Sequence, residues 1–564
     1  MGVSSRPFAW EKSYPAGMSW DMPVQTSTLP ALLREAAATY GPNPALEFRG
    51  HRISYGDLLR QAETVAGAFM RAGIGQGSAV ALYLPNTPYH PLSFFGATLT
   101  GARLVHLSPL DAERELAHKL KDSGARTLVT TNIGGMYERA EKLLEAGLVD
   151  LLVVGDDSEW GPCPVQPSPS TERPRVVTFA SFTAGVERPG SFPEIRPEDI
   201  ALLQYTGGTT GMPKGAILTH ANLTAAVSMY ANWFGAIPKD RTEHDRILCV
   251  LPLFHIYALT TILLRGLKRG AEIMLRARFD VEQTLRDIEI GRATHFPGVP
   301  TMWIALSAVP GIETRDFSSL AYCGSGGAPL PVEVADRFQR LTGHRLVGGW
   351  GMTETSPAGT NRLSAGATKP GTIGLPLPGV EMDVCSLADP SKVLPPGEVG
   401  ELRIRGPNVT KGYWNRPEET DAAFVGDWFL TGDIGYMDED GFFFIVDRKK
   451  DMIISGGFNV YPQMIEQAIY EHPAVHEVLV VGVPDSYRGE SAKAFVKLRD
   501  GAEPFTLEEL QAFLKDKLGR HEMPQALEIR PALPRTAVGK LSKLELRDEE
   551  RRKAAETLAQ RGAA

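Results

Sequence analysis

Hydrophobic and polar positions follow two alternating patterns along the first part of the chain. The segment 54–74 carries apolar residues at helical spacing, and Ser54 is placed to cap its first turn. Three stretches of continuous apolar character, AVALYLP, ARLVHLSP and RTLVTT, predict strands. Helices that alternate with such strands cover both faces of a mainly parallel sheet. The pattern therefore predicts an α/β fold.

The pattern changes near residue 375. The stretch GEVGELRIRGPNVTKGYW has the short strands and glycine turns of a small antiparallel unit. Further along, Pro462 begins one predicted helix, and Thr506 with Glu509 forms a capping box at another. We expect a large N-terminal domain of packed α/β sheets that includes the small antiparallel β unit, residues 1–447. A small α+β domain, residues 448–564, follows it.

Length and composition agree with this division. A chain of 564 residues is too long for one ordinary core, and 43% hydrophobic with 22% charged residues is typical of a globular protein. The net charge of −8 argues against general nucleic-acid binding. Four cysteines lie far apart and show no metal or redox spacing. We therefore expect a reduced, cytoplasmic protein.

One apolar run, residues 247–264, approaches the length of a membrane span. Pro252 and His255 near its middle would be costly in lipid. A strand, a turn and a buried helix are the better prediction. The first twenty residues contain no apolar segment of the kind that a signal peptide requires.

The stretch YTGGTTGMPKG, residues 205–215, combines glycines, threonine hydroxyls and Lys214. This composition suits a phosphate cradle, because glycine lets backbone N–H groups approach an anion. It is not a P-loop, since Gly215 follows the lysine where a P-loop has Ser or Thr. Short strands are predicted on both sides, at 201–205 and 216–220. The sequence thus indicates a hairpin clamp, and a plain flexible hairpin is the alternative.

Three further stretches carry candidate chemistry. In GGWGMTETSP, the Trp350 ring can stack on a base and Glu354 can hold a magnesium ion, or Glu354 is an ordinary surface carboxylate. Asp433, beside a glycine, can accept ribose hydroxyls or can be a turn residue. Lys540 near the chain end is, by spacing alone, a solvated charge. GSGGAP, residues 324–329, can pass close to a flat ring or form a tight turn.

Together these stretches resemble, over nearly the full chain, the adenylate-forming superfamily of acyl-CoA synthetases, peptide-synthetase adenylation domains and beetle luciferases. Five motifs match in order: YTGGTTGMPKG, LPLFHIYAL, GGWGMTETSP, FLTGDIGYMDEDGFFFIVDRKKDMIISGG and PRTAVGKLSK. Gly207, where many members have serine, resembles the bacterial medium- and long-chain fatty acid:CoA ligases. The opening YPAGMSWDMP is similar to that group too.

The resemblance implies an ATP-dependent acid:CoA ligase. In this family a carboxylate attacks the α-phosphorus of MgATP, which gives an acyl-adenylate and pyrophosphate. The C-terminal domain then rotates, and the thiol of coenzyme A displaces AMP. ATP, Mg²⁺ and coenzyme A are therefore expected here. Such an enzyme chiefly aligns anions and neutralises charge.

The resemblance also implies site residues. Expected to bind ATP are Thr206, Gly207, Gly208, Thr209, Thr210, Gly211, Lys214, Gly327, Ala328, Pro329, Trp350, Gly351, Met352, Thr353, Asp433, Arg448 and Lys540. The expected catalytic residues are Lys540, Lys214, Glu354, Thr353 and His255, with Glu354 as the magnesium ligand, Lys540 as the mobile lysine and His255 as guard of the acyl tunnel. Lys450 is the expected hinge, and Gly456 and Gly457 admit coenzyme A.

Two points stay open at this stage. Trp350 departs from the tyrosine common in the family, which puts any hydrogen bond made there in doubt. His255 can equally be a satisfied core histidine. Neither is decided by the sequence.

The resemblance implies an acyl pocket lined by LFHIYAL, FPGVPTMW and YCGSGGAP, residues 253–259, 296–303 and 322–329. These stretches are mostly apolar, which favours a medium- or long-chain fatty acid. A dicarboxylic acid would require a basic residue at the far end of the acyl pocket. Arg265, Arg276 and Arg278 are the candidates, and the sequence does not distinguish among them. The alternatives are delivery to an acyl carrier protein, an aromatic-acid:CoA ligase and a catalytically silent nucleotide-binding regulator. A homodimer and a peripheral membrane contact are left open.

Overall fold

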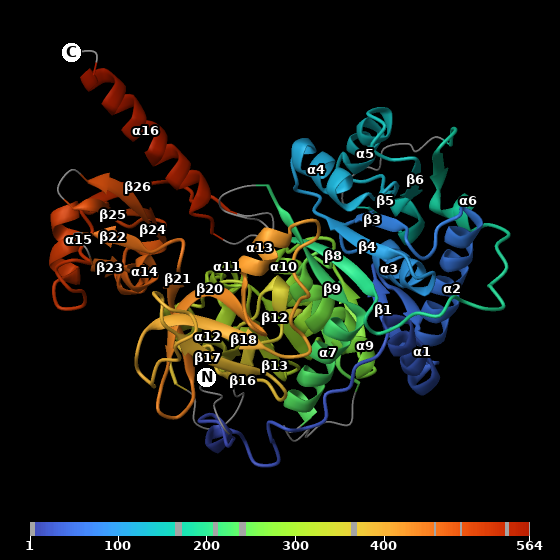
Figure 1. Cartoon of the computed structure of the whole chain (residues 1–564), viewed down its shortest axis with the longest axis horizontal. Coiled ribbons are helices and arrows are strands. Elements are labelled where there is room, and N and C mark those ends of the chain that lie inside the picture. The colour runs from blue at the N-terminus through green and yellow to red at the C-terminus, as the bar shows by residue number, and fades with distance from the viewer. Residues whose placement is uncertain are drawn as a thin grey trace.

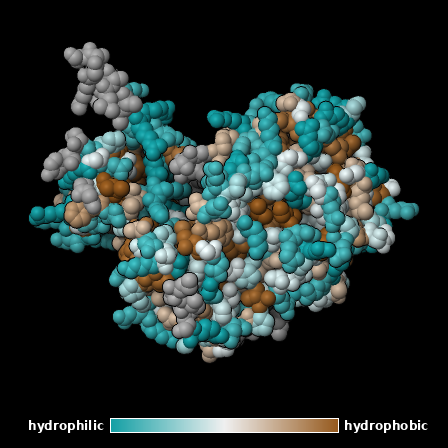
Figure 2. Space-filling model, in the orientation of Figure 1, coloured by the Kyte–Doolittle hydropathy of each residue, from teal (hydrophilic) through white to brown (hydrophobic). Residues whose placement is uncertain are grey.

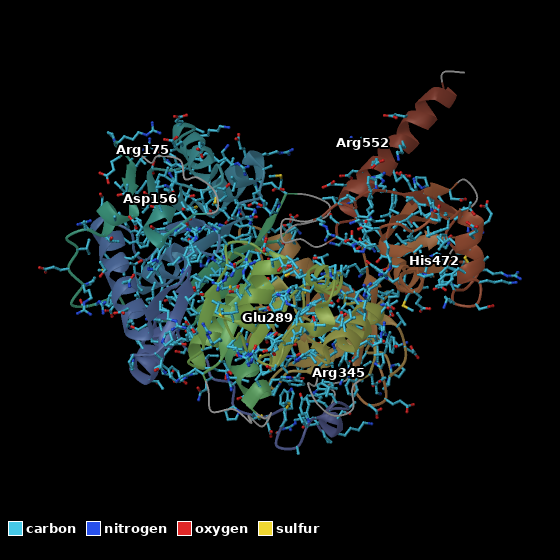
Figure 3. All side chains as sticks on the ribbon, turned by 180° about the vertical axis from the view of Figure 1, so that it is seen from behind. Asp156, Arg175, Glu289, Arg345, His472 and Arg552 are labelled. Atoms are coloured by element: carbon cyan, nitrogen blue, oxygen red, sulfur yellow. The ribbon has the colours of Figure 1, made fainter. Side chains whose placement is uncertain are left out.

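The computed structural model describes residues 6–163, 172–206, 212–235, 244–362, 369–455, 458–485, 488–535 and 541–562. It contains two seven-stranded sheets, a five-stranded antiparallel sheet and, at the C-terminal end, a separate five-stranded sheet with its own helices (Figure 1). The α/β architecture, the small antiparallel unit and the C-terminal α+β unit predicted from the sequence are confirmed. Side chains that carry nitrogen and oxygen atoms project from all of these units (Figure 3).

The first sheet is parallel except at one edge. Its order is β7-β6-β5-β3-β4-β8-β9, and only the pairing of β8 with β9 is antiparallel. The strands are β3 (Ala79–Tyr83), β4 (Arg103–Leu107), β5 (Thr127–Thr131), β6 (Leu151–Gly155), β7 (Val176–Thr178), β8 (Ile200–Thr206) and β9 (Lys214–Thr219). Its helices include α1 (Leu29–Tyr40), α2 (Tyr55–Arg71), α3 (Tyr89–Leu99), α4 (Glu113–Ser123), α5 (Met136–Glu145) and α6 (Phe179–Thr183).

The second sheet has the order β14-β13-β12-β10-β11-β1-β2 and is parallel except for β1 with β2. Its strands are β1 (Pro44–Phe48), β2 (His51–Ser54), β10 (Arg246–Cys249), β11 (Glu272–Leu275), β12 (His295–Gly298), β13 (Tyr322–Ser325) and β14 (Leu346–Val347). The chain of this part also forms α7 (His220–Gly235), α10 (Val281–Glu289), α11 (Pro300–Ser307) and α12 (Val332–Thr342).

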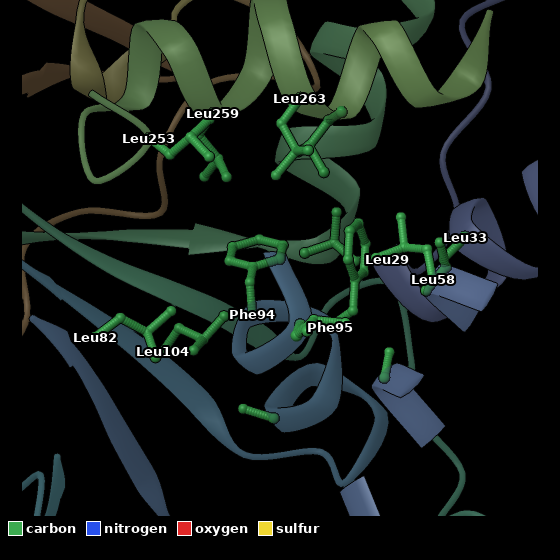
Figure 4. Packing of buried hydrophobic residues seen from close by; sticks show 14 of the residues in the cluster. Leu29, Leu33, Leu58, Leu82, Phe94, Phe95, Leu104, Leu253, Leu259 and Leu263 are labelled. Atoms are coloured by element: carbon green, nitrogen blue, oxygen red, sulfur yellow. The ribbon is translucent and has the colours of Figure 1, made fainter. Parts of the chain in front are cut away.

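The apolar run 247–264 folds as predicted. It supplies most of β10 and then α8 (Ile256–Ala258) and a π-helical turn (Leu259–Leu264), and α9 (Arg265–Lys268) follows directly. Leu259 and Leu263 face Phe94 and Phe95 of α3 in the core (Figure 4). Within the described ranges, no helix combines the length and apolar character that crossing a bilayer requires.

The antiparallel unit and the C-terminal unit complete the chain. The former contains β17 (Glu381–Cys385), β18 (Gly400–Arg405), β19 (Phe424–Val425), β20 (Trp428–Met437) and β21 (Phe443–Arg448), with β15 (Thr360–Asn361), β16 (Leu375–Pro376) and α13 (Pro417–Ala422) beside it in the chain. The latter contains β22 (Ile453–Ser455), β23 (Phe458–Val460), α14 (Pro462–Tyr470), β24 (Val475–Asp485), β25 (Gly489–Leu498), α15 (Leu507–Leu514), β26 (Ala526–Ile529) and α16 (Leu544–Gly562).

Local sequence signals explain where several helices start. The Ser54 hydroxyl accepts the Asp57 N–H at α2, Pro462 occupies the first turn of α14, and Thr506 forms the predicted capping box at α15. Hydrophilic residues cover most of the face seen in Figure 2, and hydrophobic ones form only scattered patches on it.

Candidate active site

The β8–β9 hairpin carries the two ends of the glycine-rich stretch. Thr206 pairs with Lys214, and the Thr206 hydroxyl lies 3.5 Å from the Lys214 carbonyl oxygen. Two antiparallel strands therefore flank the stretch, as predicted, and no helix follows the lysine directly. Gly207, Gly208, Thr209, Thr210 and Gly211 lie outside the described residues.

Lys214 projects from β9 toward a tyrosine that the sequence analysis did not single out. Its Nζ lies 5.3 Å from the ring centroid of Tyr413 and 3.8 Å from a Glu419 carboxylate oxygen, and the side chain is 37% exposed. Tyr413 is held against β9 by a backbone bridge to Ala216. The ammonium group is therefore accessible, and its contacts are weak enough to exchange for an anion.

Glu354 lies in the short helical turn Thr353–Thr355 and is only 5% exposed. The Tyr413 hydroxyl donates a hydrogen bond of 2.8 Å to its Oε1. Burial raises the pKa of Glu354, while this hydrogen bond acts in the opposite direction. Tyr413 thus touches both Lys214 and Glu354 and joins two predicted site residues.

The residues around Glu354 fit a magnesium ion that is held jointly by the protein and by substrate phosphates. The described part of the chain contains no cluster of three or more His, Cys, Asp or Glu side chains suited to a metal. Magnesium at nucleotide sites is often held by one or two carboxylates together with substrate phosphates. A single buried carboxylate, Glu354, suits that arrangement.

The chain around Glu354 approaches other backbone so closely that glycine is required. A Cβ at Gly351 would lie 1.5 Å from the Pro357 carbonyl oxygen, and one at Gly348 would lie 1.9 Å from the Ser325 oxygen. Contacts of this length exclude any side chain. The glycines of GGWGMTETSP therefore fix the backbone on both sides of Trp350.

Trp350 keeps a hydrogen bond although it is not tyrosine. Its indole N–H donates to Asp433 Oδ2 at 2.7 Å, and Arg448 Nε lies 2.6 Å from Asp433 Oδ1. Asp433 is buried on β20, and burial raises its pKa while Arg448 and Trp350 oppose the shift. Of the three predicted nucleotide-binding residues, Asp433 therefore contacts both Trp350 and Arg448 directly.

Two groups of contacting residues lie near each other: Trp350 with Asp433 and Arg448, and Glu354 with Tyr413 and Lys214. The charges of Arg448 and Asp433 both act on the pKa of Glu354, the first lowering and the second raising it. Met352 and Thr353, both partly exposed, connect Trp350 to Glu354 along the chain.

Other predicted residues of the described chain lie in a loop after β13 and at the start of α8. Gly327, Ala328 and Pro329 form the loop after β13, with Gly327 in the left-handed region at φ +76°. His255 caps α8, where its Nδ1 accepts the Tyr257 N–H at 3.2 Å, and it stays partly exposed. This contact gives His255 a structural role and leaves its predicted role at the acyl tunnel a prediction.

Lys450 lies in the turn directly after β21, where Asp451 N–H bonds to the Arg448 carbonyl oxygen at 2.9 Å. The turn separates the antiparallel unit from the C-terminal unit. Lys540, Gly456 and Gly457 lie outside the described residues, so their predicted roles rest on the resemblance.

Comparison with known proteins agrees with this geometry. The AMP-binding enzyme family matches residues 33–414, and the AMP-binding enzyme C-terminal domain matches residues 464–540. A long-chain-fatty-acid--CoA ligase of Bacillus subtilis is 39% identical over 96% of this chain and 98% of its own length. A feruloyl-CoA synthase of Amycolatopsis is 37% identical over 89% of this chain and 95% of its own.

Solved structures are similar as well. ATP-bound MatB from Rhodopseudomonas palustris superposes with a TM-score of 0.82 at 28% identity, over 93% of this chain and 99% of that one. An anthranilate CoA ligase, AuaEII, in complex with anthranoyl-AMP gives 0.83 at 25% identity, over 95% and 100%. With a family match that spans most of its length and relatives this similar, the chain belongs to the AMP-binding enzyme family.

Proposed function

We propose that this protein is an AMP-forming acid:CoA ligase that activates a medium- or long-chain fatty acid. The observation that carries the proposal is the direct contact of Trp350, Asp433 and Arg448 beside the Lys214, Tyr413 and Glu354 group. The first group offers an aromatic face and a carboxylate to a nucleoside, and the second offers a cation and a metal ligand to phosphates. The similarity to a long-chain-fatty-acid--CoA ligase supports the class of acid.

The roles that we assign follow from charge and position. Lys214 and the stretch Thr206 to Gly211 bind the β- and γ-phosphates, and Glu354 ligates magnesium, which neutralises phosphate charge when bound. Thr353 lies beside the α-phosphate. Because a carboxylate oxygen accepts more than one hydrogen bond, Asp433 can receive ribose hydroxyls while it keeps its contacts to Trp350 and Arg448.

We assign the two half-reactions to two parts of the chain. Residues 1–447 bind acid, ATP and magnesium, and residues 448–564 move about Lys450. In the first arrangement Lys540 brings its positive charge to the meeting of two anions, the carboxylate and the α-phosphate. In the second arrangement Gly456 and Gly457 admit the pantetheine chain of coenzyme A. A cytoplasmic location and a homodimer are part of the same proposal.

The test measures pyrophosphate release with ATP and monocarboxylic acids from C4 to C18, with and without coenzyme A. We expect turnover that depends on the acid and a thioester product only with coenzyme A. Lys540→Ala should lose pyrophosphate release by roughly a hundredfold or more while it keeps ATP binding, because one charge-stabilising donor is removed. Unchanged release would exclude the role of Lys540, and ATP binding without acid-dependent release in the wild type would indicate a silent regulator.

A second candidate is an aromatic acid. The feruloyl-CoA synthase and the anthranilate CoA ligase among the similar proteins are named for aromatic acids, and Tyr257 and Tyr322 add aromatic rings to the predicted pocket. Including benzoic and cinnamic acids in the same assay separates the two candidates, since turnover of aromatic acids alone would contradict the fatty-acid assignment.

A further inference from the structure

A buried arginine in the predicted acid-binding region has no carboxylate partner within the part of the chain that the structure describes. Arg265 begins α9, directly after the π-helical turn, and is 3% exposed. Its Nε donates to the Thr261 carbonyl oxygen at 2.8 Å. Among the described residues, no acidic side chain lies within ion-pair distance of it, and its two terminal nitrogens have no hydrogen-bond acceptor.

Such a position is energetically unfavourable unless something compensates. A buried charge normally pairs with an opposite charge, because its desolvation is expensive. Burial lowers the pKa of Arg265; Asp245 acts in the opposite direction only from beyond ion-pair distance, and Arg269 adds like charge. Asp245 itself lies 4.0 Å from His295 Nδ1. The guanidinium therefore retains unused donor capacity.

Aromatic side chains surround this guanidinium. Its Cζ lies 4.7 Å from the Phe234 ring centroid, and Tyr322 meets Phe234 edge-on with centroids 5.1 Å apart. Tyr230 also stacks with Phe234, with ring centroids 6.3 Å apart. The charges of Arg265 and Arg362 both oppose the burial that raises the pKa of Tyr322, so two cations lie near this phenol.

The same aromatic group reaches back to the nucleotide side of the site. A Cβ at Gly326, in the loop that continues to Gly327, would lie 2.8 Å from the Tyr257 ring. Tyr257 and Tyr322 remain partly exposed although burial raises the pKa of both phenols. Partly exposed rings deep in the protein are available to a ligand.

The spacing along the helix gives the distance between Tyr257 and Arg265. The Thr261 hydroxyl donates to the Tyr257 carbonyl oxygen, and Arg265 donates to that of Thr261, so the three residues follow one another at intervals of four. Eight helical residues place Arg265 at most about 12 Å from Tyr257 along the axis, because the π-helical turn between them rises less per residue than an α-helix does. Arg265 is thus remote from Tyr257, which lies beside the loop that continues to the predicted nucleotide-binding residue Gly327.

We propose that Arg265 determines specificity by binding an acceptor oxygen at the end of the acid remote from its reacting carboxyl group. The substrate is then a carboxylic acid that carries a second carboxylate or a terminal hydroxyl or phenol. This inference rests on the proposed ligase function and narrows its substrate class. It also explains why an unpaired cation is retained in an otherwise apolar region.

The test compares acids of equal length that differ only at the far end: an n-alkanoic acid, its ω-hydroxy acid and its α,ω-dicarboxylic acid, with cinnamic and 4-hydroxycinnamic acids as an aromatic pair. The wild type should prefer acceptor-bearing acids in kcat/KM by roughly 10- to 100-fold, as expected for a hydrogen bond to a charged group. Preference for the dicarboxylate indicates an anion, and preference for the hydroxy acids indicates a neutral acceptor.

Arg265→Leu should abolish or reverse this preference, mainly through KM for the polar-ended acids, with KM for ATP unchanged. Arg265→Lys should restore part of it. Arg269→Leu, one helical turn further on and partly exposed, is the matched control and should leave the preference unchanged. Because Leu suits an apolar environment, the thermal midpoint of Arg265→Leu should not fall, which confirms folding.

Equal kcat/KM for the matched acids in the wild type, or an unchanged preference in Arg265→Leu, would overturn the inference. Either result leaves the ligase function standing, since the acids are still activated. Failure of every acid to release pyrophosphate would instead contradict the proposed function.

Discussion

At the scale of single residues, Tyr413 links Glu354, the proposed magnesium ligand, to Lys214, the lysine that we propose binds phosphate. Its hydroxyl bonds to Glu354 and its ring lies beside Lys214. Burial and the neighbouring carboxylate raise the pKa of this phenol, so it stays protonated and remains a donor. The hydrogen bond and burial together fix the orientation of the Glu354 carboxylate, which we propose as the magnesium ligand.

Tyr413→Phe should therefore weaken magnesium-dependent activity by about 10- to 100-fold, the usual effect of removing a group that orients a metal ligand. Pyrophosphate release as a function of MgCl₂ concentration measures it, and the half-saturating concentration should rise. Tyr436→Phe is the matched control, because Tyr436 lies elsewhere, on β20, where its ring stacks on Phe444. An unchanged magnesium dependence in Tyr413→Phe would show that Glu354 needs no such support.

Trp350 offers a second residue-scale prediction. Trp350→Phe keeps an aromatic face but leaves the buried Asp433 Oδ2 without its donor. An unsatisfied buried acceptor costs about 1–3 kcal/mol, so KM for ATP should rise roughly 5- to 100-fold if Asp433 binds the ribose.

Trp160→Phe controls for the loss of an indole, since the buried Trp160 N–H has no partner among the described residues. Initial rates measured at varied ATP concentrations give the KM for ATP of each variant. A wild-type KM in Trp350→Phe, with normal thermal stability, would remove Trp350 and its contact to Asp433 from nucleotide binding.

These residues also show how far the sequence alone could lead. Motif spacing selected Trp350, Glu354 and Asp433, and the structure brings them together. Tyr413 was not selected, because its role depends on a partner 59 residues away. Arg265 was one of three candidate arginines among which the sequence could not choose, because the choice depends on burial. A tyrosine in KGYW or an arginine after an apolar run carries no such information until the chain is folded.

At the scale of elements, His220 joins the start of α7 to the start of α1. It is buried, and its Nδ1 accepts the Leu29 N–H at 3.2 Å. Burial lowers its pKa from 6.5 to about 4. The unfolded chain therefore binds a proton at a higher pH than the folded protein does, and stability is lost as the pH falls from 6.5 toward 4.

His220→Asn keeps an acceptor near Nδ1 but cannot titrate. Between pH 7 and pH 4.5 the wild type should lose up to about 3 kcal/mol more stability than the variant, given about 1.4 kcal/mol per pKa unit. Urea unfolding at the two pH values measures the difference, and the buried His90 and His106 affect both proteins equally. Parallel losses in the two proteins would contradict the assignment.

Elements were predictable where local chemistry defines them. The cap at Ser54, the early Pro462 and the capping box at Thr506 all mark real helix starts. The π-helical turn Leu259–Leu264 was not predicted, because hydrophobic periodicity does not separate it from an α-helix in a fully buried segment. Sheet order was equally hidden, since β1 pairs with β11 across more than two hundred residues.

At the scale of the whole molecule, the turn at Lys450 connects two units with separate cores. Arg547 of α16 bonds to the Lys450 carbonyl oxygen at 3.3 Å and forms an ion pair with Asp451, and Lys543 pairs with Glu466 of α14 at 2.9 Å. The chain on the C-terminal side of the turn is thus tied into its own unit. Relative movement of the two units has to be absorbed by the few residues of the turn.

Lys450→Pro should separate the two half-reactions if the turn is the hinge. Proline fixes φ at position 450 and restricts Lys449, so the variant holds one arrangement of the two units. We expect one half-reaction to remain within a few-fold of the wild-type rate and the other to fall roughly tenfold or more, because only one arrangement stays accessible. Single-turnover pyrophosphate release measures the first step, and thioester formation from preformed acyl-adenylate measures the second.

Lys450→Ala removes the same side chain without restricting the backbone and should retain both steps. Equal losses in both steps of Lys450→Pro would indicate a folding defect, and equal retention would exclude movement about this turn.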